Sequence, residues 1–565
     1  MDLIERIINS IQVSLIILPV SILFFAIDYY FDKGTIQNNL AWIVPVFLGV
    51  TLFLLIFSFL FSFKDLKKLF KKIDRKTWIV LLLVFLVGFS LRVFVAPHTH
   101  RLYFDEDMYL EMGQNIVRSG RAVVCQYGTP DKCYSWIYNK EPAGYPFLIS
   151  TCFLFGNIET PAYYFTAIIS SLTILTVFFI AYLLFENKKI SLFSTLIFVL
   201  IPVAIRWAPT TSTDTVFMFF SGLVVFAFLS YFKNSSNRLL LFSFASLAYA
   251  IQIRPEGILL IFIVMFMFIF FKRNLFSMIG KKWFLIIFVI FLLLIVPHLL
   301  HLNSVKEDNW GSSQNKLGLE YVSGNLYDNG MFFFENTRFP VVFSIFALIG
   351  LFLYRFWKES LFLVLWFVLF FGLYLLFYAG SFNYGVDVRY SLTMYPPVAI
   401  LGGCGAFLIA DTLNKFMAKL VDRKWSSMIS IVVVILVISA SFFPFISFVS
   451  SNGEKAWDAR LHHDFLVEKM KELDDDSWII TLVPSIVLIN GKNAIDPNFL
   501  RDQEKLNKLL TKNTSIYFYE GYWCQSEPFK SNICQYIHDN FHLIIYDKIT
   551  EKYRTYTLYK VNLVR

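Results

Sequence analysis

Long apolar runs recur along most of this 565-residue chain, and they constrain its fold more than any other feature. A membrane-crossing helix needs about 17–25 apolar residues, because the hydrocarbon core of a bilayer is about 30 Å thick. Hydrophobic residues make up 57% of the chain and charged residues only 16%, an excess that a soluble fold does not need. The sequence therefore predicts an all-α polytopic membrane protein. About thirteen runs are long enough to cross, near residues 8–30, 40–63, 78–96, 160–185, 189–209, 212–232, 238–253, 255–272, 283–301, 339–356, 359–380, 391–411 and 427–449.

The apolar run 143–155 is too short for a comfortable crossing, and its status decides the topology. If it does not cross, all the basic loops between the spans lie on one side, as the positive-inside rule favours. We therefore expect 143–155 to be a juxtamembrane or re-entrant helix, with the N-terminus in the cytoplasm and the C-terminus outside the cell membrane. The net charge of +9 then reflects topology and does not indicate binding to nucleic acid.

The composition changes after Val449, and the remaining residues are mostly polar. Strand-like runs alternate there with helix-like segments, a pattern that predicts a small extracytoplasmic α/β domain. The expected organisation has three parts. They are two N-terminal spans with a basic cytoplasmic loop (1–77), the main membrane module with its outer loop 97–142 (78–449), and the C-terminal domain (450–565).

Four of the six cysteines form two close pairs in the segments predicted to lie outside. Cys125 and Cys133 are eight residues apart in the outer loop, and Cys524 and Cys534 are ten apart in the C-terminal domain. Paired cysteines in polar segments suit an oxidising compartment. We therefore predict two disulfides, with four free thiols as the alternative.

A cluster of three carboxylates, Asp105, Glu106 and Asp107, follows the span that ends near residue 96. The residues that follow predict an amphipathic helix along the outer membrane surface, with Asp105, Tyr109 and Met112 on its apolar face. Asp105 is therefore expected to point toward the membrane module, and its two neighbours away from it. A helix cap is the alternative, because acidic residues at a helix N-terminus also favour its dipole. The predicted polar face carries Glu111, Gln114, Asn115 and Arg118.

Basic residues lie at the outer ends of several spans, on the side where arginine is disfavoured. Single examples are usually snorkelling side chains, but a group of them in the plane of Asp105 and Asp214 indicates an anion site. Asp214 also has the simpler interpretation of a helix start. The members of the group are Arg92, Lys140, Arg206, Arg254 and Arg389. The spacings of His98, His100, His298 and His301 are compatible with metal binding, but the sequence assigns no metal to them.

Five segments occur in a fixed order over about residues 78–411: Phe104 to Glu111, Glu141 to Pro146, Ser212 to Asp214, Arg254 to Gly257, and Asp387 to Tyr390 leading into Pro396 and Pro397. Together they resemble the GT-C superfamily of membrane glycosyltransferases that use polyprenyl-phosphate sugars. The resemblance favours the branch of protein O-mannosyltransferases and lipid A aminoarabinose transferases. In one departure, Glu141 stands where the family often has a basic residue, with Lys140 one position earlier.

The resemblance implies inverting transfer of a sugar from a polyprenyl-phosphate-linked donor to a hydroxyl of a protein, glycan or lipid acceptor. It implies no required cofactor, although a divalent cation on Asp105 and Asp214 would suit a diphosphate donor. The implied roles are as follows: catalysis by Asp105 as base with Glu106 and Asp214; donor phosphate binding by Lys140, Arg254, Arg389, Arg206 and Arg92; and positioning of donor or acceptor by Tyr109, Glu141, Tyr145 and Tyr390.

Two other classes fit the sequence less well. A secondary transporter or a flippase for lipids or lipid-linked sugars would carry ionisable residues in mid-membrane, whereas here they gather at one interface and no inverted repeat is evident. A receptor or scaffold would not need so many spans. Membrane lipids are expected partners under every interpretation.

Overall fold

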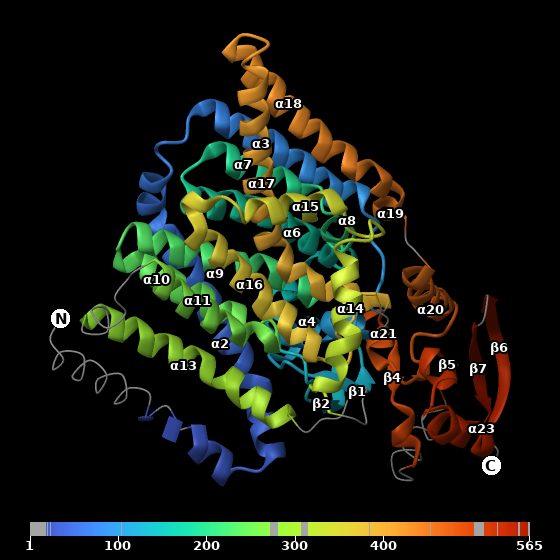
Figure 1. Cartoon of the computed structure of the whole chain (residues 1–565). Coiled ribbons are helices and arrows are strands. Elements are labelled where there is room, and N and C mark those ends of the chain that lie inside the picture. The colour runs from blue at the N-terminus through green and yellow to red at the C-terminus, as the bar shows by residue number, and fades with distance from the viewer. Residues whose placement is uncertain are drawn as a thin grey trace. The chain divides into compact units, whose positions relative to one another are not determined.

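The computed structural model divides the chain into two compact units (Figure 1). Unit 1 comprises Met1–Pro97, Lys140–Gly144 and Tyr164–Ser451, and unit 2 comprises His98–Asn139, Tyr145–Tyr163 and Asn452–Arg565. The structure describes residues 18–562 except positions 20, 23, 103, 384 and 528 and segments 272–280, 307–314, 452–453, 502–513 and 552–553.

Unit 1 is helical in the part of the chain that is described, and α9, α10 and α11 lie against one another within it (Figure 1). A 3-10 helix, η6 (Gly385–Met394), leads directly into the long helix α17. The helices of unit 1 are α2 (Lys33–Leu69), α3 (Arg75–Ser90), α6 (Glu159–Phe185, shared with unit 2), α7 (Lys188–Val199), α8 (Pro202–Arg206), α9 (Thr213–Lys233), α10 (Asn237–Ile251), α11 (Leu259–Phe270), α13 (Lys282–Val305), α14 (Val322–Phe332), α15 (Val341–Gly350), α16 (Trp357–Leu376), α17 (Tyr395–Met417), α18 (Arg423–Phe442) and α19 (Ile446–Ser450).

Eight helices among the described residues are long and apolar enough to cross a membrane, which confirms the polytopic class but not all thirteen expected crossings. The expected run 189–209 is wrong as a single helix. Pro202 has no backbone N–H, so α7 ends before it and α8 begins with it. The run 8–30 falls largely outside the described residues. Four shorter apolar helices cover Gly144–Phe155, Asn237–Ile251, Pro255–Phe270 and Val341–Gly350.

Small residues allow α17 to pack closely against α7 and α15. A Cβ added at Gly403 would lie 2.0 Å from Ser194 Oγ, and one at Gly405 would lie 1.9 Å from the carbonyl oxygen of Phe346. Helices in a bilayer gain no hydrophobic free energy when they leave lipid for another helix, so close backbone packing of this kind is what holds them together. The glycines of α17 therefore hold this helix, which follows η6, tightly against α7 and α15.

Unit 2 contains a seven-stranded sheet with the order β2-β1-β4-β3-β5-β7-β6. The prediction of a small α/β domain is confirmed, and the β1–β2 hairpin from the outer loop is an addition that the sequence did not reveal. The central strands β3, β4 and β5 are parallel, and β7 and β6 form an antiparallel edge (Figure 1). The strands are β1 (Val124–Thr129), β2 (Lys132–Ile137), β3 (Trp478–Ile480), β4 (Asn493–Ile495), β5 (Ile516–Glu520), β6 (His542–Glu551) and β7 (Arg554–Asn562).

Helices cover both faces of this sheet. Ile479 joins a core with α20 and α21, whereas its neighbours Trp478 and Ile480 join a second core with α23. A strand buried on both faces reads as a continuous apolar run, which is why β3 could be predicted. The helices of unit 2 are α4 (Phe104–Ser119), α5 (Gly144–Ile149, with the 3-10 turn Ser150–Phe155), α20 (Glu454–Met470), α21 (Pro484–Ile489) and α23 (Gln535–Asn540).

Both predicted disulfides are present, Cys125–Cys133 and Cys524–Cys534, and Cys152 and Cys404 are free and buried. The first disulfide joins β1 to β2, and the second lies in the core beside α23.

Helix α4 differs from its prediction. The pattern predicts a helix with one polar face exposed, but every residue from Glu106 to Gln114 is buried. The polar face is buried because it packs on α21 and β1, and its Glu111 accepts a hydrogen bond from the Ser485 hydroxyl. Hydrophobic periodicity identified the helix, but it could not reveal that polar partners cover the other face.

Candidate active site

The end of α9 in unit 1 carries a buried carboxylate that joins two arginines. Ser212 caps α9 by accepting a hydrogen bond from the Asp214 N–H, and its hydroxyl donates to Asp214 Oδ2 at 2.7 Å. This cap fixes the Asp214 carboxylate at the first turn of the helix. Oδ1 forms an ion pair with Arg254, and Oδ2 lies 3.4 Å from Arg389 Nε. The sequence-predicted residues Asp214, Arg254 and Arg389 therefore lie together.

Arg254 follows the C-terminus of α10 and is held by two carboxylates. Besides Asp214 it pairs with Glu256, and its Nη1 donates to Thr213 Oγ1 at 3.1 Å. Glu256 in turn accepts a hydrogen bond from the Tyr374 hydroxyl at 2.8 Å. The guanidinium is thus oriented by fixed acidic and hydroxyl groups, and its charge is balanced before any ligand binds.

Tyr390 lies between the two arginines. Its ring centroid is 5.6 Å from Arg254 Cζ and 4.9 Å from Arg389 Cζ, and the ring stacks on Tyr374. Arg389 Nη2 also donates to the Tyr390 hydroxyl at 3.3 Å. Cations favour the face of an aromatic ring, so this tyrosine keeps two like charges close together.

The segment Lys140–Gly144 belongs to unit 1 and is attached to the end of α10. The Gly144 N–H donates to the carbonyl oxygen of Gln252, and the Tyr249 hydroxyl donates to the carbonyl oxygen of Gly144. A Cβ at Gly144 would lie 2.3 Å from the same Gln252 oxygen, so glycine is required for this approach. Lys140 and Glu141 come shortly before this anchored glycine and are therefore held near the loop that carries Arg254.

The two other arginines of the predicted site have different surroundings. The buried Arg92 donates to the backbone carbonyl oxygens of Gly88, Phe198 and Val199. Arg206 places its guanidinium 4.4 Å from the ring centroid of Phe448. Both arrangements connect helices of unit 1.

The first turn of α4 in unit 2 gives each of its three carboxylates a different environment. Asp105 is half-buried. Glu106 is buried, and its Oε1 accepts hydrogen bonds from the N–H groups of Arg101 and Leu102, which come just before the helix. Asp107 is buried beside two imidazoles. Glu106 therefore ties the segment before α4 to the first turn of the helix.

Asp107 lies among residues that the sequence did not bring together. Its Oδ1 is 3.9 Å from His100 Nε2 and 3.7 Å from His463 Nε2, and the imidazole centroids are 4.2 Å apart. His100 Nε2 is also 2.9 Å from Glu159 Oε1. Burial raises the pKa of Asp107 to about 6, although the imidazoles partly oppose this. Burial alone would lower the pKa of His100, but Asp107, Glu106 and Glu159 outweigh it and raise that pKa to about 9.

The predicted positioning residues Tyr109 and Tyr145 are both buried in unit 2, with their rings edge to face at 5.8 Å. His298 and His301 lie one turn apart on α13 of unit 1, where His301 Nε2 is 3.0 Å from the Lys140 carbonyl oxygen. They form no cluster with other metal-binding residues in the part of the chain that the structure describes.

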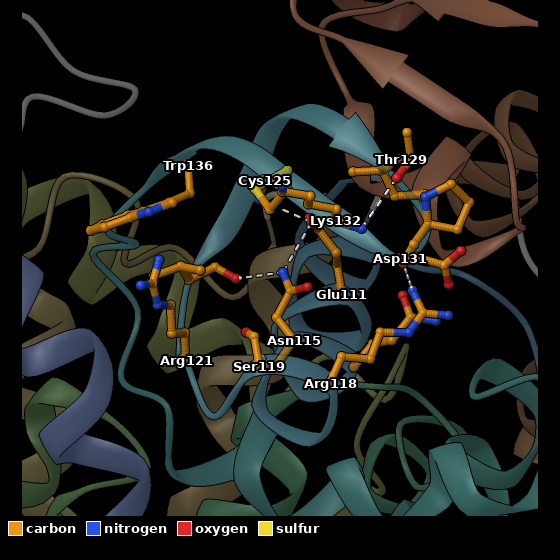
Figure 2. A pocket seen from close by; sticks show the side chains of 15 residues that line it. Glu111, Asn115, Arg118, Ser119, Arg121, Cys125, Thr129, Asp131, Lys132 and Trp136 are labelled. Atoms are coloured by element: carbon orange, nitrogen blue, oxygen red, sulfur yellow. Dashed lines mark hydrogen bonds between the residues drawn. A yellow bond between two sulfur atoms is a disulfide. The ribbon is translucent and has the colours of Figure 1, made fainter.

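A cavity of about 150 Å³ lies between the C-terminal half of α4 and the β1–β2 hairpin (Figure 2). Figure 2 shows Glu111 and Asn115 at its centre, with Arg118 and Arg121 at its sides. Asn115 Nδ2 donates to the Val123 carbonyl oxygen, and Arg118 donates to the Pro130 carbonyl oxygen. None of the predicted catalytic, donor or acceptor residues lines this cavity.

Comparison with solved structures shows the class of fold, which is that of the GT-C membrane glycosyltransferases. Apo ArnT from Cupriavidus metallidurans matches with a TM-score of 0.54 and 12% identity, over 86% of this chain and 97% of that one. The archaeal oligosaccharyltransferase AglB from Archaeoglobus fulgidus, in complex with an inhibitory peptide and a dolichol-phosphate, matches with a TM-score of 0.51 and 13% identity, over 80% of this chain and 69% of that one.

A family model described as dolichyl-phosphate-mannose-protein mannosyltransferase matches residues 140–301. This segment contains Lys140, Asp214 and Arg254. No curated protein matches the chain significantly.

Proposed function

We propose that this protein is a membrane glycosyltransferase that moves a sugar from a polyprenyl-phosphate-linked donor to an acceptor hydroxyl, with inversion at the anomeric carbon. The observation that carries the proposal is the pair Arg254 and Arg389, held on the single carboxylate of Asp214 in a chain with the GT-C fold. ArnT and AglB structures with this fold contain undecaprenyl phosphate and dolichol-phosphate, respectively, which supports a lipid-linked donor. The acceptor is a hydroxyl of a protein, glycan or lipid.

In this proposal the arginine pair stabilises the leaving group, which is the lipid phosphate. As the bond from the anomeric carbon to the phosphate oxygen breaks, negative charge develops on the phosphate, and guanidinium groups stabilise it by paired hydrogen bonds. Asp214 and Glu256 hold the arginines in place before the donor arrives, so little reorganisation is needed during the reaction. Lys140 supplies a further charge. We leave Arg92 and Arg206 out of the donor site, because their guanidinium groups already connect helices.

Asp105 is the proposed base. It accepts the proton of the acceptor hydroxyl while the acceptor oxygen bonds to the anomeric carbon and the lipid phosphate leaves with the electron pair. Among the three carboxylates of the first turn it is the half-buried one, whereas Glu106 accepts backbone N–H groups from the segment before the helix and Asp107 faces imidazoles. General-base assistance of this kind contributes typically about 10²–10⁴-fold. Tyr109 and Tyr145 support the helix from its buried side, and Tyr390 supports the arginines.

A divalent ion shared by Asp105 and Asp214 is not part of this proposal, because the Asp214 carboxylate is already paired with two guanidinium groups. Two cations on one carboxylate leave little affinity for a third. If a diphosphate donor needs an ion, that ion has to displace an arginine first.

The test is transfer of radiolabelled sugar from polyprenyl-phosphate donors by the full chain in liposomes. Asp105→Asn should lower transfer by about 10²–10⁴-fold with normal membrane insertion. Asp539→Asn is the matched control, because Asp539 is an exposed carboxylate of the same unit. Wild-type transfer by Asp105→Asn would refute the assignment of the base. Movement of the lipid-linked sugar across vesicles without any transfer would replace the proposal with a flippase.

A further inference from the structure

The cluster around Asp107 has features that a helix cap or an ordinary ion pair does not explain. Asp107 is fully buried, and neither of its oxygens accepts a hydrogen bond from any described residue. His463 is 2% exposed, and its Nε2 also has no hydrogen-bond partner among the described residues. A buried carboxylate without donors is costly, so this arrangement calls for a cation to complete it.

The donor atoms have the right separations to share one ion. His100, Asp107 and His463 each offer an atom, and these atoms all lie within 4.8 Å of one another. Ligands of a tetrahedral ion at bond lengths of about 2.0–2.1 Å are about 3.4 Å apart. The 3.7 Å and 3.9 Å separations from Asp107 Oδ1 to the two Nε2 atoms need to contract by only a few tenths of an ångström.

Both histidines have a carboxylate behind the ring, as metal-binding histidines usually do. His463 Nδ1 lies 3.3 Å from Asp464 Oδ1, which leaves the Nε2 lone pair directed toward Asp107. His100 Nδ1 lies 3.8 Å from Glu106 Oε2. The contact with Asp464 favours the His463 tautomer whose Nε2 is free to bind an ion, whereas His100 Nε2 faces Glu159 at 2.9 Å and has to release its proton when an ion binds.

The charge of the region points the same way. Four carboxylates, Glu106, Asp107, Glu159 and Asp464, surround the two imidazoles, and Arg460 pairs with the last two of these four. Glu159 also accepts a hydrogen bond from Tyr163 and pairs with Arg460, so it keeps these two partners when His100 Nε2 binds an ion. A divalent cation would offset the remaining excess of negative charge.

From this geometry we propose that His100 Nε2, Asp107 and His463 Nε2 bind a divalent transition-metal ion, with Zn²⁺ as the preferred species. Two imidazoles and one carboxylate suit Zn²⁺, whereas Mg²⁺ and Ca²⁺ prefer sites built from oxygen. Binding displaces the His100 Nε2 proton that faces Glu159. The fourth position is open to water.

The ion has a positioning role and not a catalytic one. It connects α20, through His463, to the segment before α4 and to the first turn of α4. Asp107 is two positions from Asp105, about 200° around the helix, so the two carboxylates face different directions. The ion would therefore fix the helix end that carries the proposed base. Binding of the ion does not depend on the proposed function, and only its role in placing the base rests on that function.

The experiment uses the full chain purified in detergent, stripped with a chelator and titrated with ZnCl₂ alone. One Zn²⁺ per chain should bind, and the thermal midpoint should rise when it does. Asp107→Asn and His463→Ala should weaken binding by at least about 100-fold, since loss of even an outer-shell partner costs 10–100-fold. Co²⁺ in the wild-type protein should give the spectrum of a nitrogen–oxygen site, a readout that does not require any variant to fold.

Glu111→Gln is the matched control, because Glu111 is a buried carboxylate one turn further along α4 whose oxygens already have donors. It should bind Zn²⁺ as the wild type does. Equal Zn²⁺ binding by Asp107→Asn and the wild type would overturn the proposal, as would a stripped protein that neither binds Zn²⁺ nor gains stability from it. Loss of transfer by Asp105→Asn with Zn²⁺ still bound would separate this site from the proposed active site.

Discussion

Arg254 and Arg389 share Asp214, but Arg254 contributes more to folding stability and Arg389 more to sugar transfer. Substitution of each arginine should separate these two contributions. Arg254 pairs with both Asp214 and Glu256 in a site where all three side chains are about one-tenth exposed or less. Arg389 has a longer contact with Asp214, at 3.4 Å. At an effective dielectric constant of about 20 this contact is worth about 5 kcal/mol of gross attraction, most of which the desolvation of both groups cancels.

Arg389→Gln should therefore leave the stability of the protein nearly unchanged and lower kcat/KM for the polyprenyl-phosphate sugar by about 10²–10³-fold. That factor is the usual cost of removing one donor to a developing oxyanion, about 2.7–4 kcal/mol. Arg254→Gln should act differently. It leaves Glu256 buried without its cation and Asp214 with only the longer contact to Arg389, which costs about 3–5 kcal/mol of folding stability.

The measurements are sugar transfer in liposomes and thermal unfolding in detergent, for both variants and for Arg238→Gln. Arg238 is an exposed arginine at the other end of α10, so its substitution should change neither quantity. The reasoning is refuted if Arg389→Gln retains wild-type kcat/KM, or if Arg254→Gln unfolds at the wild-type temperature.

Three further predictions concern stability. Burial raises the pKa of Glu111 to about 7, so the folded state binds a proton that the unfolded state releases above about pH 4.5. The stability of the folded state therefore falls as pH rises through 7. Glu111→Gln should remove that fall in thermal scans from pH 5 to 8. Reduction of Cys524–Cys534, or its double serine variant, should destabilise the protein by about 2–4 kcal/mol, and equal unfolding with and without reductant would contradict this. Gly403→Ala should lower the thermal midpoint by an amount equivalent to about 1–3 kcal/mol, because the new methyl group would overlap Ser194; an unchanged midpoint would show that the helices separate freely.

The membrane helices could be predicted from the sequence because their signal is local. Apolar length alone identified α2, α3, α6, α9 and α13, whereas the short run 143–155 is one of four shorter apolar helices, and its status as non-crossing stays a prediction. The errors came from proline and from helix ends, which length does not resolve. Pro202 divided a run that reads as continuous.

The roles of the polar side chains were harder to predict, because they depend on partners that are distant in the sequence. Asp214, Arg254 and Arg389 could be grouped, since each marks the end of an apolar run and the motifs occur in the order of a known family. His463 had no such signal. It lies in a polar helix more than 350 residues after Asp107, and only the folded chain brings the two together. The β1–β2 hairpin was missed for the same reason, because β1 pairs with β4 from the C-terminal segment.

The acidic cluster at the start of α4 provides the last prediction, because its three neighbouring carboxylates have three separable tasks. Successive helical residues differ by about 100° in direction, so Asp105, Glu106 and Asp107 must face different surroundings. Glu106→Gln removes the charge from a buried group that accepts two backbone N–H groups and should cost about 1–3 kcal/mol of stability with transfer retained. Asp107→Asn should lose Zn²⁺ binding and the stability that Zn²⁺ confers.

Asp105→Asn should lower transfer by about 10²–10⁴-fold while keeping both stability and Zn²⁺ binding. Asp107→Asn should lower transfer only through the lost ion, so high Zn²⁺ should restore part of it; this result would support the positioning role of the ion. A series in which all three variants lose transfer and stability together would mean that the first turn has only a structural role.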